Sequence, residues 1–166
     1  MLPAILDFAR RIKEQSNIPT GIVLEVGAYN VNGSPREVFQ AEAKSYIGVD
    51  MDEGPDVDRV VNGEELTTAF DHTFDTVICM ETLEHVKNPW KVVEQLKAVL
   101  SPGGHLWIST PTFGFPLHRF PIDCYRFGED AYRLVFFADM ELIALEEVKD
   151  SENNPVIVAV GRKKLD

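Results

Sequence analysis

The segment from residue 22 to residue 50 constrains the fold of this chain more than any other. It begins with Ile22-Val23-Leu24-Glu25-Val26, a short apolar run rich in β-branched residues that predicts a buried parallel strand. A turn bounded by Gly27 and Gly33 follows, and Ser34-Pro35 then has the composition of an N-cap with proline at the first helical position. Strand, tight turn and helix start together bring the backbone close to a ligand at the carboxyl end of the strand.

A second apolar run, Tyr46-Ile47-Gly48-Val49, stops at Asp50. An acid at the tip of the second strand is placed to accept hydrogen bonds from a ribose diol, so we expect a nucleoside-containing cofactor. The turn lacks the G-x-G-x-x-G pattern of dinucleotide sites, because Tyr29 and Asn32 stand at two of its glycine positions. This failure disfavours an NAD-dependent reductase or epimerase.

What remains of the pattern, Glu25-x-Gly27 with a later Gly33, resembles motif I of class I S-adenosylmethionine-dependent methyltransferases. Most members of that family carry further glycines within the turn. The run from Val31 to Arg36 is similar to a V-N-G-S-x-R segment found in a subgroup. The resemblance implies S-adenosylmethionine as cofactor, with Glu25 facing its ammonium group.

The resemblance also implies cofactor contacts at the ends of the first four strands. Glu64 or Glu65 matches the position of an acid or amide that bonds the adenine amino group, although both also suit a solvated first helical turn. The complete set of expected cofactor residues is Glu25, Gly27, Tyr29, Gly33, Asp50, Met51, Glu64, Glu65, Met80 and Glu81.

Hydrophobic periodicity predicts the remaining elements. Helices are expected over residues 3–16, 35–43 and 129–137, and after the Asn88-Pro89 cap; further strands are expected over 45–49, 57–61, 74–80, 105–110, 141–148 and 156–160. Leu83-Glu84-His85-Val86 and Leu100-Ser101-Pro102-Gly103-Gly104 resemble two more family segments. The expected fold is α/β and Rossmann-like, a seven-stranded, mostly parallel sheet with an antiparallel closing strand and helices on both faces. We expect one domain over 1–166, an N-terminal helix within 1–19 and a core over 20–162.

Composition excludes several kinds of partner. The formal net charge is −11 without a basic stripe, which disfavours nucleic acid as a partner because such a surface repels a phosphate backbone. The two cysteines, Cys79 and Cys124, make no disulfide framework and fit a reducing cytoplasm. No apolar run is long enough to cross a membrane, so we expect a cytoplasmic protein. With little chain for a capping insertion, the site is either open or completed by a second copy in a homo-oligomer.

The stretch from Pro111 to Phe127 is irregular and rich in aromatic residues, proline and arginine. Part of it is similar to an H-x-x-P-x-D-x-x-R-F segment of methyltransferase-like proteins, some from polysaccharide gene neighbourhoods. The functional interpretation makes His118 a general base oriented by Asp123. The expected acceptor-binding residues are Arg119, Tyr125 and Arg126. In the structural alternative, Asp123 pairs with Arg126 to pin the loop and His118 bonds backbone.

Glu81, Glu84 and His85 would share one face of a helical turn, as metal ligands do. Such groupings are also common where a loop enters a helix, and we expect no metal here. The predicted function is S-adenosylmethionine-dependent methylation of oxygen or nitrogen in a small-molecule or saccharide-like acceptor. The alternative is a catalytically silent module that uses the same fold to bind a partner.

Overall fold

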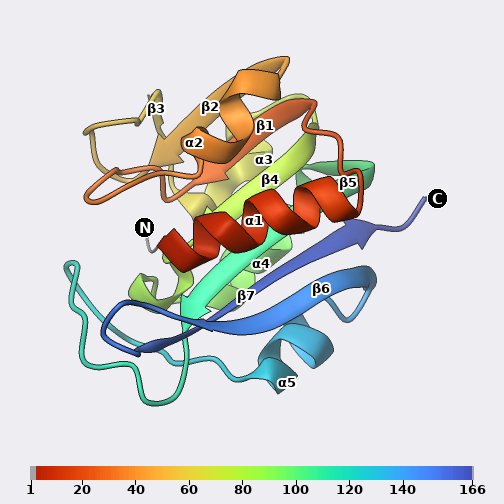
Figure 1. Cartoon of the computed structure of the whole chain (residues 1–166). Helices are drawn as coiled ribbons and strands as arrows, with labels where there is room; N and C mark the ends of the chain where they lie inside the picture. The colour runs from red at the N-terminus through yellow and green to blue at the C-terminus, as the bar shows by residue number, and fades with distance from the viewer. Residues whose placement is uncertain (1–2, 166) are drawn as a thin grey trace.

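A seven-stranded sheet organises the computed structural model, which describes residues 3–165 (Figure 1). The strand order is β3-β2-β1-β4-β5-β7-β6. The strands are β1 (Ile22–Val26), β2 (Ser45–Asp50), β3 (Arg59–Val60), β4 (Phe74–Met80), β5 (Leu100–Pro111), β6 (Met140–Lys149) and β7 (Pro155–Lys163). Strands β1 to β5 pair in parallel, whereas β7 runs antiparallel between β5 and β6. The predicted sheet and its closing hairpin are confirmed.

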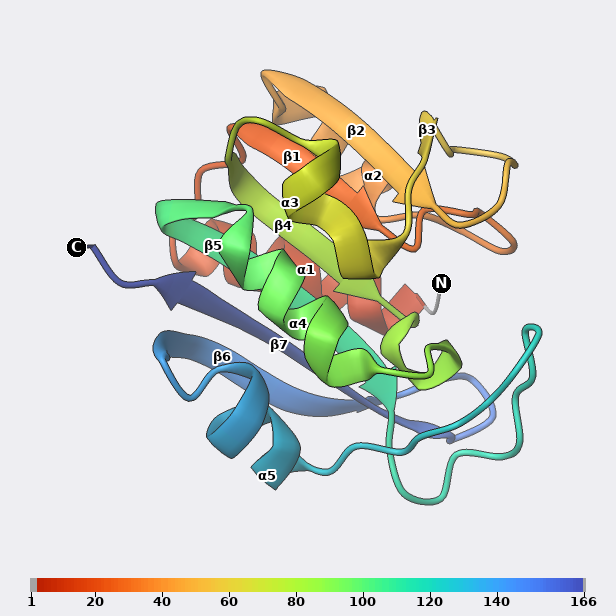
Figure 2. The same ribbon diagram turned by 180° about the vertical axis from the view of Figure 1, so that it is seen from behind.

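Helices cover both faces of the sheet. They are α1 (Pro3–Gln15), α2 (Arg36–Phe39), α3 (Leu66–Ala69), α4 (Pro89–Ala98) and α5 (Glu129–Ala131), with short 3₁₀ turns η1 (Gln40–Glu42), η2 (Gly63–Glu65) and η3 (Leu83–His85). Helices α1 and α2 lie in front of the sheet in Figure 1, and α3 and α4 lie in front of it when the molecule is turned in Figure 2. No helix within residues 3–165 is long and apolar enough to cross a membrane.

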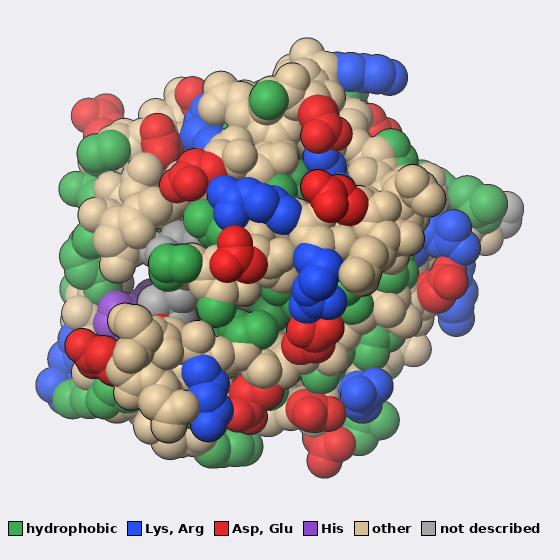
Figure 3. Space-filling view, in the orientation of Figure 1, with side chains coloured by type: hydrophobic (Ala, Val, Ile, Leu, Met, Phe, Trp, Pro, Cys, Tyr) green, Lys and Arg blue, Asp and Glu red, His purple; other side chains and the backbone are tan. Residues whose placement is uncertain are grey.

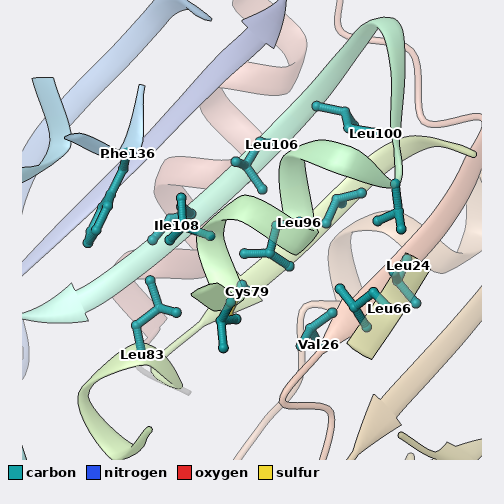
Figure 4. Packing of buried hydrophobic residues seen from close by; sticks show 14 of the residues in the cluster. Leu24, Val26, Leu66, Cys79, Leu83, Leu96, Leu100, Leu106, Ile108 and Phe136 are labelled. Atoms are coloured by element: carbon teal, nitrogen blue, oxygen red, sulfur yellow. The ribbon is translucent and has the colours of Figure 1, made fainter. Parts of the chain in front are cut away.

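The alternation of side chains along each strand divides the core into two clusters. Leu24 and Val26 point into the cluster under α3 and α4 (Figure 4), whereas Val23, which precedes Leu24, belongs to the cluster with the buried residues of α1. The same alternation separates Ile108 from Trp107 on β5. Because both faces of the central strands are covered, these strands read as continuous apolar runs in the sequence.

Several predicted elements differ at their ends; β5, expected over 105–110, already begins at Leu100. The helix expected over 35–43 is one α-turn followed by a 3₁₀ turn, and the third strand has only two residues. The helix expected over 129–137 continues into a π-turn, Tyr132–Phe136, where the Phe137 N–H donates to the Tyr132 carbonyl at 2.9 Å. This wider turn buries Tyr132, Phe136 and Phe137 together, and tertiary packing of that kind overrides local helical preference.

Candidate active site

The loops that follow β1, β2, β4 and β5 meet at one edge of the sheet, on the left of Figure 1. Parallel strands end there with their carboxyl ends together, which is where ligands bind in open sheets. The surface is hollowed at this edge beside histidine side chains (Figure 3). A cavity of about 640 Å³ opens beside His118; its lining includes Asp7, Phe115 and Lys149 and contains none of the residues expected to bind the cofactor.

The turn after β1 is fixed by its contacts with β2 and with the loop after β4. The backbone N–H groups of Gly27 and Ala28 both donate to the Val49 carbonyl, at 2.9 and 3.0 Å. Gly27 has φ +84°, and a Cβ there would overlap the Thr82 side chain. Only glycine allows this close approach. The structure therefore explains why the first glycine of the motif is present.

Hydrogen bonds from the side chains of Asn30 and Arg36 fix the rest of the turn, where most members of the family carry further glycines. The Asn30 side chain accepts the Gly33 N–H at 2.8 Å and donates to Asp56 at 2.7 Å. Arg36 donates to the Asp56 carbonyl at 2.9 Å and forms an ion pair with Asp58. The V-N-G-S-x-R segment thus ties the turn to the loop after β2.

Glu25 lies beneath this turn and is only 4 % exposed. Its Oε2 accepts a hydrogen bond from the Tyr46 hydroxyl at 2.7 Å. Burial raises the pKa of Glu25 to about 7, although the Tyr46 hydrogen bond and the charge of Arg36 act in the opposite direction. Direct contact between Glu25 and a ligand stays a prediction.

Asp50 lies at the edge, as predicted, and most of its hydrogen-bonding capacity is used. Its Oδ1 accepts the backbone N–H groups of Met51, at 2.7 Å, and of Asp52, at 3.4 Å, and its Oδ2 accepts that of Tyr29, at 3.2 Å. A carboxylate has about four acceptor sites, so one remains, on Oδ2, for a ligand hydroxyl. Tyr29 and Met51 flank it with exposed side chains, and the Phe120 ring lies 6.1 Å from that of Tyr29.

The two candidate adenine contacts differ in their surroundings. Glu64 is half-buried and lies 3.4 Å from the Lys91 ammonium, whereas Glu65 is exposed. Asn62 caps this turn by accepting the Glu64 N–H at 3.0 Å. Glu64 is therefore the more enclosed of the two acids.

The end of β4 carries a strained residue. Glu81 has φ +53°, which is uncommon for any residue other than glycine and recurs at functional sites. Ser109 on β5 holds it there, since the Glu81 N–H donates to the Ser109 carbonyl and the Ser109 hydroxyl donates to the Glu81 carboxylate, both at 3.0 Å. Burial raises the pKa of Glu81 to about 7. The preceding Met80 side chain packs into the core, so mainly its backbone lies at the edge.

Arg126 does not face an acceptor, which corrects its predicted role. Its guanidinium donates to both oxygens of Asp123, at 2.5 and 2.7 Å, and to the carbonyls of Phe115, Pro116 and Tyr125. These contacts use all five of its N–H groups. Arg126 therefore pins the loop from 111 to 128 from within, as in the structural alternative.

Asp123 does not orient the His118 ring, which is a second correction. Its Oδ2 accepts the backbone N–H of His118 at 2.6 Å, and the hydrogen bonds from Arg126 lower the pKa of Asp123 to about 2. The His118 imidazole lies instead beside His85, with 5.1 Å between ring centroids. Partial burial and the neighbouring His85 lower the pKa of His118.

The other two residues expected to hold an acceptor have different environments. Tyr125 donates its hydroxyl to the Lys87 carbonyl at 3.0 Å and stacks on Phe127, so it helps to dock the loop. Arg119 is exposed and makes no hydrogen bond or ion pair within the part of the chain that the structure describes. Arg119 is thus the arginine of this loop that is available to a ligand.

Sequence reasoning missed the position of Glu84 and His85 relative to His118. The carboxylate of Glu84 is fully buried, and His85 Nδ1 donates to the Ile122 carbonyl at 2.5 Å. The Glu84-His85 segment was visible in the sequence, but its contact with the loop from 111 to 128 depends on tertiary structure alone.

Comparison with solved structures supports the fold. The N-methyltransferase NodS from Bradyrhizobium japonicum WM9, in complex with S-adenosyl-L-homocysteine, superposes with a TM-score of 0.70 at 14% identity over 95% of this chain and 85% of that chain. A S-adenosylmethionine-dependent methyltransferase from Clostridium acetobutylicum gives a TM-score of 0.72 at 10% identity over 99% and 92% of the two chains.

Sequence comparison identifies the family. A ubiquinone biosynthesis O-methyltransferase from Hahella chejuensis is 35% identical over 122 residues, covering 65% of this chain and 49% of the relative. The same-named protein from Vibrio parahaemolyticus is 37% identical over 102 residues, 53% of this chain and 43% of the relative. The chain thus spans about half the length of these relatives. Residues 4–135 match the methyltransferase domain family, and the chain belongs to that family.

Proposed function

We propose that the chain binds S-adenosylmethionine at this edge and transfers its methyl group to an oxygen or nitrogen of a small-molecule acceptor. The observation that carries the proposal is the Asp50 carboxylate, which lies at the tip of β2 beside the Gly27 turn and keeps an acceptor site on Oδ2 for a ribose hydroxyl. Family membership supports the reaction, and the S-adenosylhomocysteine complex of NodS supports the cofactor.

Three groups of residues would hold the cofactor. Asp50 takes the ribose hydroxyls, while Tyr29 and Met51 offer exposed side chains against the adenine. Glu25 and Glu81 supply negative charge for the ammonium of the methionine moiety. The remaining contacts are assigned to the backbone of Gly27, Gly33 and Met80 and to Glu64 or Glu65.

The acceptor would enter through the cavity beside His118. The lone pair of the acceptor oxygen or nitrogen attacks the methyl carbon of S-adenosylmethionine as the carbon–sulfur bond breaks. S-adenosylhomocysteine leaves, and His118 takes the acceptor proton. Alignment in a dry site supplies roughly 7–11 kcal/mol, whereas a base adds on the order of 10²- to 10⁴-fold. The curated relatives are O-methyltransferases, which favours oxygen as the acceptor atom. Arg119 suits a negatively charged group on the acceptor, and a saccharide is one candidate class.

Calorimetric titration of the full chain with S-adenosylmethionine, S-adenosylhomocysteine and NAD tests the cofactor assignment. We expect the two adenosyl compounds to bind and NAD not to bind. At 100 times its Kd, each of the two should stabilise the fold by about 2.7 kcal/mol.

Asp50→Ala should lower the affinity for both adenosyl compounds by roughly 10- to 100-fold, since the charge-assisted hydrogen bonding to the ribose is lost. Asp52→Ala is the matched control, because Asp52 is an exposed acid of the same loop, and it should leave affinity unchanged. Failure of the wild-type chain to bind either compound would sink the proposal and favour the silent partner-binding module.

A further inference from the structure

Glu84, His85 and His118 form a cluster to which the proposed cofactor contacts assign no ligand. Each offers one ligand atom, and these atoms lie within 4.8 Å of one another. Glu84 and His85 belong to η3, which directly follows β4, and His118 comes from the loop after β5. The three residues therefore meet at the edge where the acceptor would bind.

The Glu84 carboxylate lacks a hydrogen-bonding partner in the described structure. Its side chain is 0 % exposed, and neither oxygen has a hydrogen-bond partner. The nearby Arg126 guanidinium is already engaged, and the Glu81 carboxylate adds a second negative charge. Burying an unpaired carboxylate is costly, and buried acids are normally paired or coordinate a metal. The environment of Glu84 calls for a cation.

His85 directs a free nitrogen lone pair toward the Glu84 carboxylate. Because a carbonyl only accepts, the hydrogen bond to Ile122 places the proton on Nδ1 and leaves Nε2 unprotonated in the neutral ring. That Nε2 lies 3.4 Å from Glu84 Oε1, so two acceptors face each other. An imidazole whose other nitrogen donates to a backbone carbonyl is the usual arrangement of a metal-binding histidine.

His118 supplies the third ligand from a loop that is held in place. The Cys124 N–H donates to the Glu84 carbonyl at 2.8 Å, and Asp123 holds the His118 backbone at 2.6 Å. Two ligands on one zinc ion lie at most ~4.2 Å apart, since each is about 2.1 Å from the metal. The three ligand atoms lie up to 4.8 Å apart, so the exposed His118 ring has to move closer for the ion to bind.

We propose that Glu84, His85 and His118 bind one divalent transition-metal ion. Two imidazoles and one carboxylate are a donor set suited to Zn²⁺ or Fe²⁺, and three protein ligands leave coordination positions open. If the proposed methyl transfer is correct, an acceptor hydroxyl occupies an open position. The ion would lower the pKa of that hydroxyl, whose proton would pass to solvent, so the role of His118 as base applies to the metal-free chain and its role as ligand to the metal-loaded one. The expectation of no metal rested on Glu81, Glu84 and His85 without His118.

The test is calorimetric titration of the metal-stripped full chain with ZnCl₂, without S-adenosylmethionine. We expect one ion per chain. Glu84→Gln keeps the shape of the side chain, and His118→Ala lies at an exposed position. Each should weaken Zn²⁺ binding by roughly 100-fold or more. This exceeds the 10- to 100-fold loss typical of replacing a residue that only supports a metal ligand. His72→Ala removes another half-exposed histidine and should leave the affinity unchanged.

Circular dichroism of each metal-free variant checks that it is folded, and the Co²⁺-loaded chain should show visible absorption that His118→Ala alters. Absence of Zn²⁺ and Co²⁺ binding below about 1 mM, or equal affinity in wild type, Glu84→Gln and His118→Ala, would overturn the proposal. Cofactor affinity measured on the same metal-free samples reports separately on the proposed methyltransferase function.

Discussion

At the scale of single residues, the main feature of the site is its buried acids. Glu25 lies under the first turn with one hydrogen bond, and Glu81 occupies a left-handed backbone conformation at the end of β4. Burial raises the pKa of both to about 7. Such acids favour the binding of a positively charged ligand and lower the stability of the empty protein.

Replacing Glu25 by glutamine should stabilise the empty protein at alkaline pH. The pKa of Glu25 is raised from 4.5 to about 7, so the burial penalty grows as pH rises through this window and is complete above it. Glu25→Gln, which retains an acceptor for Tyr46, should add roughly 2–4 kcal/mol to the free energy of unfolding at pH 8 and much less at pH 5. Urea titrations at the two pH values measure this difference.

Glu53→Gln is the control for this prediction, because Glu53 is exposed in the loop after β2 and its replacement removes the same charge. It should leave the pH dependence of stability unchanged. An equal gain at both pH values for Glu25→Gln would show that the charge of Glu25 is not the cause.

At the scale of elements, the loop from 111 to 128 acquires its shape from Arg126 and from contact with η3. A loop of this length without secondary structure is uncommon unless it is functional. Its carbonyls accept from the Arg126 guanidinium, its Cys124 N–H donates to the Glu84 carbonyl, and its Tyr125 hydroxyl donates to the Lys87 carbonyl. The loop can therefore hold His118 at a fixed place while the ring itself stays exposed.

Arg126→Lys should loosen this loop without unfolding the sheet. An ammonium has three donors in place of five and cannot bond both oxygens of Asp123 in the same planar geometry. We expect a loss of about 1–3 kcal/mol of stability and hydrogen exchange in residues 115–125 that is faster by about tenfold or more. Mass-spectrometric hydrogen exchange measures the effect.

Arg133→Lys is the matched control, since Arg133 is exposed on the π-turn and pairs with Glu129 at 3.4 Å. Its exchange pattern should equal that of the wild type. Unchanged protection of the loop in Arg126→Lys would contradict the role assigned to Arg126.

At the scale of the whole molecule, negative charge is the dominant electrostatic feature. With a net charge of −11, like charges repel across the folded surface. Sodium chloride should therefore raise the Tm at pH 8, by about 2–5 °C between 0.05 and 0.5 M. Scanning calorimetry at the two concentrations measures the shift. The effect should vanish near pH 5, close to the sequence pI of about 4.8, and a fall in Tm at pH 8 would contradict it.

The succession of strands and helices along the chain was predictable because its signals are local. Residues 22–35 and 88–89 carry strand, turn and capping patterns within a few positions, and the structure places β1 and the start of α4 as predicted. The ends of elements were less predictable. The π-turn at Tyr132–Phe136 depends on burying three aromatic rings together, which no local pattern specifies.

By itself, the sequence determined the strands and helices and the edge at which Asp50 and Glu81 lie, because alternating burial and turn chemistry act between near neighbours. The family followed from the resemblance of its motifs to known segments. Only the tertiary structure decided that Arg126 is engaged within its own loop and that His118 meets Glu84 and His85. These contacts join segments far apart in the chain. Their geometry is set by how an irregular loop docks on η3, and periodicity carries no information about such docking.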